Sequence, residues 1–149
     1  MKYLKHAFLL MLVMTWNFSI ANPLKGIKEI GILVESLHDD AEKCNVSKNY
    51  IESSLRIALS SSTLKIVSTD IADSYIYVNT NIIYQTKFCV ASIETSFEKY
   101  AVSERKIGTF WRKSGLLING NNHNMQKRVG DTTDSHTKQF IGAWLKANQ

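Results

Sequence analysis

The chain has 149 residues, 44% of them hydrophobic and 21% charged, with a formal net charge of +5. Its only local groups of basic residues are three short pairs, Arg105-Lys106, Arg112-Lys113 and Lys127-Arg128, each diluted by other residues. A nucleic-acid binder usually concentrates its positive charge, so this pattern argues against a nucleic-acid partner.

The first 21 residues have the pattern of a secretory signal peptide. Lys2 and Lys5 form a positive start, and an apolar segment follows over residues 7–13. Ser19 and Ala21 are the small residues that signal peptidase requires, so we expect cleavage after Ala21. The alternative is an uncleaved membrane anchor, but the apolar run is shorter than the roughly 20 residues that cross a bilayer.

Residues 22–149 are expected to form a single exported α/β domain, periplasmic or secreted. Loss of Lys2 and Lys5 lowers the formal net charge from +5 to +3. No later segment has 18 unbroken apolar residues, which predicts that the chain is soluble after signal removal. The sequence leaves its oligomeric state open.

The segment "HDDAEKCNVS", residues 38–47, has the residue types of a catalytic or metal site. Its spacing argues against a metal. No calcium-loop pattern follows Asp39, and no second histidine lies near His38 at a spacing that suits zinc. We interpret it as a polar loop whose carboxylates lie near the positive amino terminus of the next helix. No metal and no cofactor are predicted.

Cys44 and Cys89 are the two cysteines of the chain. An exported protein folds in an oxidising compartment, where paired thiols become disulfides. The alternative is a catalytic thiol, which needs a free thiolate and a nearby base, and no protease signature accompanies either cysteine. We therefore predict a disulfide between them.

Seven elements follow the predicted leader. A buried strand is expected over residues 27–36, and then an amphipathic helix from Ser47 to about Ser60, which Asn45 or Ser47 can cap. A short strand and three longer ones rich in β-branched and aromatic residues come next, and a second amphipathic helix ends the chain. Their ranges are 64–68, 74–84, 88–97, 108–120 and 131–147.

This order, β-α-β-β-β-β-α, predicts an α+β fold. We expect a two-layer α/β sandwich, with a mostly antiparallel sheet and two helices on one of its faces. Alternation along the strands then places Ile76, Val78 and Ile93 toward the helices. Tyr75, Tyr77 and Glu94 fall on the opposite face, where a mixture of aromatic and polar side chains suits recognition. We predict these three as binding residues.

Residues 50–82 together with "GTFW" and the terminal helix resemble the amino-terminal α/β domain of the Tol-system periplasmic protein and the related curli-secretion lipoprotein domain. The matching residues are Leu64 to Val67, at the short strand, and Ala72 to Tyr75, at the entry into a long strand. The chain departs from that pattern in having no lipoprotein cysteine after the leader, no propeller domain and an additional disulfide. The resemblance implies an envelope scaffold or docking module and carries over no catalytic residue.

Two functions are compatible with these features. The first is an exported, non-enzymatic binding or assembly module that holds a protein or envelope partner, because no catalytic constellation is recognisable. The second is a small exported hydrolase, or an inhibitor of one, in which His38 and His123 meet carboxylates in space. His136 is expected at the edge of the core, on the apolar stripe of its helix.

Overall fold

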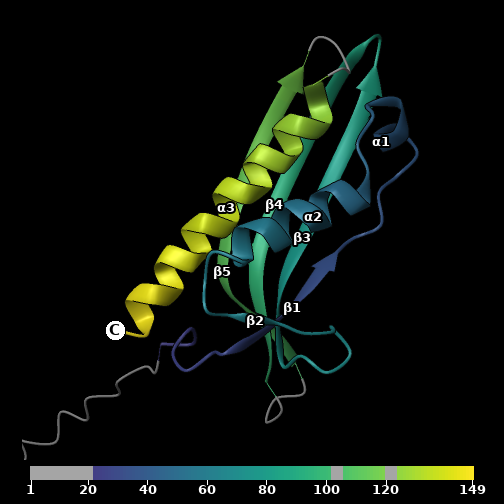
Figure 1. Cartoon of the computed structure of the whole chain (residues 1–149). Coiled ribbons are helices and arrows are strands. Elements are labelled where there is room, and N and C mark those ends of the chain that lie inside the picture. Colours follow the sequence, from purple (N-terminus) through teal and green to yellow (C-terminus); the bar gives the residue numbers. More distant parts are fainter. Residues whose placement is uncertain (1–21, 102–105, 120–123) are drawn as a thin grey trace, which may run out of the picture.

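The computed structural model describes residues 22–101, 106–119 and 124–149. The predicted signal peptide, Arg105 and His123 therefore lie outside the described residues. The elements, in order, are β1 (Glu29–Val34), α1 (Asp40–Lys43), α2 (Lys48–Leu59), β2 (Lys65–Ile66), β3 (Ser74–Gln85), β4 (Phe88–Ala101), β5 (Lys106–Asn119) and α3 (Met125–Ala147) (Figure 1).

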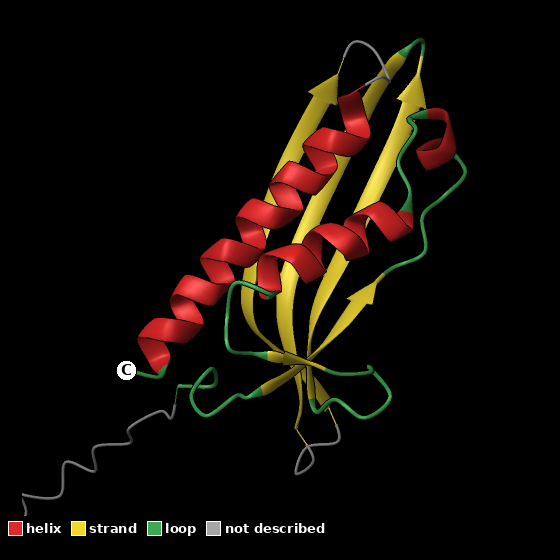
Figure 2. Cartoon of the chain, in the orientation of Figure 1, coloured by secondary structure: helices red, strands yellow, loops and turns green. Residues whose placement is uncertain are grey.

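The described strands form one five-stranded sheet in the order β2-β1-β3-β4-β5 (Figure 2). β3, β4 and β5 are a long antiparallel meander, whereas β1 pairs in parallel with both β2 and β3. Parallel neighbours need a crossover, and α2 supplies it between β1 and β2. The predicted α+β class with a mostly antiparallel sheet is confirmed.

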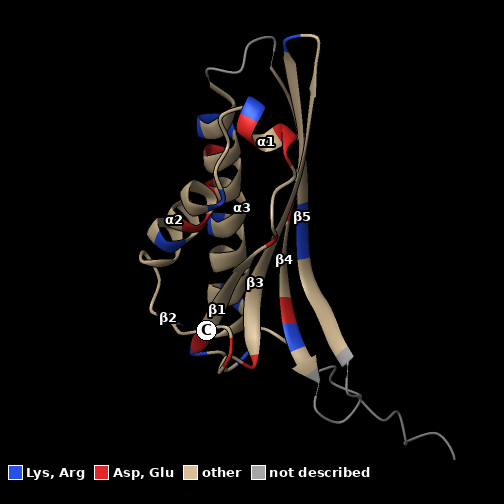
Figure 3. Ribbon diagram, turned by 90° about the vertical axis from the view of Figure 1, so that its right-hand side faces the viewer, with Lys and Arg blue, Asp and Glu red and all other residues tan. Residues whose placement is uncertain are grey.

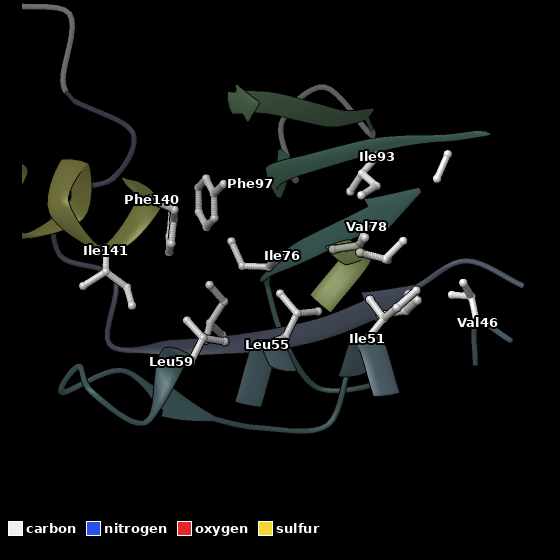
Figure 4. Packing of buried hydrophobic residues seen from close by; sticks show 14 of the residues in the cluster. Val46, Ile51, Leu55, Leu59, Ile76, Val78, Ile93, Phe97, Phe140 and Ile141 are labelled. Atoms are coloured by element: carbon white, nitrogen blue, oxygen red, sulfur yellow. The ribbon is translucent and has the colours of Figure 1, made fainter. Parts of the chain in front are cut away.

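The helices lie on one face of the sheet, as Figure 3 shows with the sheet seen nearly edge-on. The apolar face of α2 buries Ile51, Leu55 and Leu59 against β3 residues Ile76 and Val78 (Figure 4). Each such side chain contributes about 1.5–3 kcal/mol relative to its exposed state. Ser47 caps α2, as predicted, because its Oγ accepts a hydrogen bond from Tyr50 N at 3.3 Å.

The helices differ from the prediction in two ways. Asp40 to Lys43 form one helical turn where a loop was expected. α3 begins at Met125, six residues before the predicted start at Asp131, and includes Gly130. A side chain at Gly130 would overlap the ring of Tyr50 in α2, so this glycine allows close approach of the two helices. Tertiary packing thus overrides its poor helix propensity.

α1 is fixed to the sheet by two kinds of bond. Cys44, at its carboxyl end, forms the predicted disulfide with Cys89 of β4, and both residues are fully buried. Asp40 Oδ2 accepts a hydrogen bond from Tyr84 N at 3.1 Å. Bonds to Lys43 and to this backbone amide hold the pKa of Asp40 below its usual value.

Candidate functional site

The three predicted binding residues lie on the sheet face opposite the helices, which we call the outer face. Tyr75 and Tyr77 are on β3, where they pair with Glu98 and Ser96 of β4. Glu94 lies one register row further along, opposite Asn79. The alternation predicted from the strands is therefore observed, although both tyrosines are half-buried rather than fully exposed.

Tyr77 is held by a carboxylate that follows β1. Its Oη donates a hydrogen bond to Glu35 Oε2 at 2.7 Å, and Leu33 is its register partner on β1. This bond and partial burial raise the pKa of Tyr77 to about 12. The phenol is thus neutral at physiological pH and already has an acceptor, so it can offer a partner its ring more readily than its hydroxyl.

Tyr75 lies where a loop folds back over the outer face. Its register partner on β1 is Gly31, and a side chain there would come within 3.0 Å of Ala72 and 3.2 Å of Thr69. Burial, with the nearby carboxylate of Glu98, raises the pKa of Tyr75. This end of the outer face is therefore partly covered.

Glu94 marks the middle of the outer face. Arg112 of β5 lies beside it, with Nε 3.3 Å from Glu94 Oε1. Both side chains are partly exposed, and an ion pair of this kind contributes little stability in water. The pair separates the tyrosine end of the face from its other end.

The other end carries an apolar patch, defined as Ile83, Phe88, Val90, Leu116 and Ile118. Ile83, Val90 and Ile118 are register partners across β3, β4 and β5. The exposed fractions are 58% for Ile83, 52% for Phe88, 67% for Leu116 and 61% for Ile118. Clustered exposure of large apolar side chains is typical of interaction sites.

A shallow cleft of about 480 Å³ is lined by Ile83, Phe88, Val90 and Ile118 of the apolar patch, together with the turn residues Gln85 and Thr86. These residues were not among the predicted binding residues. The sequence feature that indicates them is a pair of adjacent apolar residues within a strand, such as Ile82-Ile83 and Leu116-Leu117. Neighbouring side chains of a strand point to opposite faces, so one member of each pair must lie on the outer face.

The histidines do not assemble a catalytic group within the part of the chain described. His38 is exposed and lines a separate shallow cleft with Asp39 and Glu42. His136 is buried against β4, where its Nδ1 lies 3.2 Å from Thr95 Oγ1. Over the described ranges, no set of three or more His, Cys, Asp or Glu residues is placed to hold a metal ion.

Acidification is expected to destabilise the fold through His136. Burial, and then the charge of Lys113, lower the pKa of His136 from its ordinary value of 6.5. The unfolded chain therefore takes up a proton near pH 6.5, whereas the folded chain does so only at lower pH, and stability falls as the pH drops from 7.5 to 5. Thermal unfolding across this range checks the effect. An equally steep dependence in His136→Gln would contradict it.

No helix in residues 22–101, 106–119 and 124–149 has the length and apolarity that crossing a membrane requires. No family model matches the sequence, and no curated protein matches it either.

Several solved structures are similar to the chain at low identity. A minor lipoprotein from Acinetobacter baumannii is 11% identical, with a TM-score of 0.38, over 78% of this chain and 94% of that one. The PelC dodecamer from Paraburkholderia phytofirmans is 11% identical, with a TM-score of 0.43, over 82% and 89%. A Xanthomonas campestris protein of family DUF330 is 10% identical, with a TM-score of 0.41, over 79% and 84%.

These TM-scores are below 0.5, so the similarity assigns neither a family nor an activity to the chain. It does not identify the chain as a Tol-system or curli-secretion domain, and that relation stays a resemblance.

Proposed function

We propose that the protein is an exported, non-enzymatic binding or assembly module of the cell envelope that docks a protein or envelope partner on its outer face. The observation that carries this proposal is the apolar patch. Four of its five side chains are more than half exposed, on a sheet face that no helix of the described chain covers.

The arrangement of the outer face supports binding rather than chemistry. Leaving large aliphatic side chains in water forfeits roughly 25 cal/mol for each Å² of apolar surface, which a docked partner would recover. The Glu94–Arg112 pair lies between the patch and the half-buried tyrosines, which are at the other end of the outer face. An apolar centre with a polar margin on one side is typical of an interface. Tyr75, Tyr77 and Glu94 are then contact residues at the rim.

The proposal predicts that Ile83→Ser/Leu116→Ser loses its partner without losing its fold. Both side chains are more than half exposed, so the melting temperature is expected to stay close to that of the unaltered protein. Recovery of partner from cross-linked envelope extract is expected to fall at least tenfold. Tyr75→Ala/Tyr77→Ala is expected to reduce recovery as well, with some loss of stability because Tyr77 bonds Glu35.

The matched control is Ile57→Ser/Ile71→Ser. These isoleucines are at least as exposed, but Ile57 lies on α2 and Ile71 in the loop before β3. The control should recover the partner normally. Equal loss in both double variants would mean that the recovered protein had bound nonspecifically to exposed apolar side chains. Undiminished recovery with the patch variant, together with loss in His38→Ala, would move the site to the loops and favour the hydrolase or inhibitor.

A further inference from the structure

β5 is a long strand with an open edge. It has 14 residues and pairs with β4 on one side, while the edge strand at the other end of the sheet, β2, has two. Over the described chain, no backbone hydrogen bond outside the β4 ladder involves residues 106–119. The strand contains no proline, so each of its residues keeps its backbone N–H. A row of donors and acceptors is therefore available to a further strand.

The edge is regular only over part of its length. Phe97 pairs with Trp111 and Glu98 with Thr109, so Phe110 is an extra, bulged residue. A bulge and charged residues are devices that protect an open edge from unselective pairing. At the far end, Arg128 Nη1 donates to Ile118 O at 2.5 Å. The regular segment between the bulge and this bond is residues 112–118, which we call the open segment; only its last carbonyl, that of Ile118, already accepts a side-chain bond.

The charge of this segment is positive. Arg112 and Lys113 are consecutive in β5, and Figure 3 shows a basic band midway along this strand. Arg128 lies at the segment's end. Neighbouring strand residues point to opposite faces, so one cation lies on each face of the edge. Arg112 is partly neutralised by Glu94, whereas Lys113 has no ion-pair partner among the described residues.

We propose that the open segment binds an extended, acidic segment of a partner protein as a sixth strand of the sheet. Backbone hydrogen bonds supply the affinity, acidic side chains lie opposite Arg112 and Lys113, and apolar ones lie opposite Leu116 and Ile118. A second copy of this chain fits less well, because its own residues 112–118 include no acidic side chain to lie opposite Arg112 and Lys113. This inference rests on the proposed function and names the partner's chemistry.

The test is selection of peptides from a phage-displayed library of random twelve-residue sequences on the intact protein. Selected peptides are expected to carry two adjacent acidic residues, to face Arg112 and Lys113, and two apolar residues spaced two apart, to face Leu116 and Ile118. Binding should weaken about tenfold or more when salt is raised from 50 to 500 mM, and it should disappear when alternate peptide nitrogens are methylated, because methylation removes the ladder donors but keeps the side chains. Amides of residues 112–118 that are not bonded to β4 should gain protection from hydrogen exchange.

Charge reversal supplies the matched variants. Arg112→Glu/Lys113→Glu should lose the acidic peptides, and Lys25→Glu/Lys28→Glu, at exposed lysines before β1, should bind them normally. The inference is overturned if no peptide is selected, if basic or unpatterned peptides are selected, if methylated peptides bind equally, or if single-stranded DNA competes equally. It is also overturned if the protein dimerises through β5. If one of these results is obtained while Ile83→Ser/Leu116→Ser still loses the native partner, the strand-addition inference is refuted and the proposed function is retained.

Discussion

Replacement of Ile93 by aspartate is expected to cost about 4 kcal/mol or more in the free energy of unfolding. Ile93 lies in the middle of β4, is fully buried and faces the helices. An aspartate there places a charge in the core with no cation bonded to it, which ranks among the most destabilising single changes known. Urea unfolding followed by circular dichroism measures the loss, provided that enough of the variant folds; otherwise the far-ultraviolet spectrum shows the collapse directly.

Ser92→Asp is the matched control. Ser92 precedes Ile93, so its side chain points to the outer face, where it is exposed. The same chemical change is expected to cost less than about 1 kcal/mol there, because the carboxylate reaches water. Equal losses at both positions, or an unchanged melting temperature in Ile93→Asp, would contradict the assignment of faces in β4.

The strand faces could be predicted because alternation is a local property. Residues at a spacing of two along β4 are all fully buried, namely Cys89, Ala91, Ile93, Thr95 and Phe97. A one-residue slip would expose all of them, so burial of one face fixes the register. Alternation likewise places Tyr75, Tyr77 and Glu94 on the outer face.

The apolar patch could not be predicted as a site because sequence does not say which faces are covered. Ile82 and Ile83 are identical and adjacent, yet Ile82 is buried and Ile83 is exposed. Their difference depends on the helices occupying one face of the sheet. An apolar residue on each face would equally suit a strand covered on both sides.

The helix boundaries depend on contacts between segments distant in sequence. Position 130 of α3 requires a glycine because the ring of Tyr50 occupies the space that a side chain would need. The single turn of α1 is held by Asp40, through Tyr84 N, and by the disulfide. Local propensity and periodicity do not report such contacts. For this reason the sequence predicts a loop in place of α1 and a later start for α3.

Removal of the disulfide is expected to be the second large loss of stability. Cys44 and Cys89 are 45 residues apart in sequence, and cross-linking a loop of that length restricts the unfolded chain by about 4 kcal/mol in the loop-entropy model. Cys44→Ala/Cys89→Ala leaves no polar group in the core and so isolates the cross-link better than serine would. Thermal unfolding should show a melting temperature lower by about 10 °C or more.

The loss should also have a local signature. The bond joins the end of α1 to β4, so its loss should loosen residues 41–46 more than α3. The ratio of amide exchange rates between these two segments should therefore be higher in the double variant than in the unaltered protein. Reductant is the control. When both proteins are unfolded in its presence, their stabilities should become equal, because the unaltered protein then loses its disulfide and the double variant has none to lose. A double variant within about 1 kcal/mol of the unaltered protein would show that the hydrogen bond from Tyr84 N to Asp40 and the packing of Ala41 and Val46 hold α1 without the cross-link.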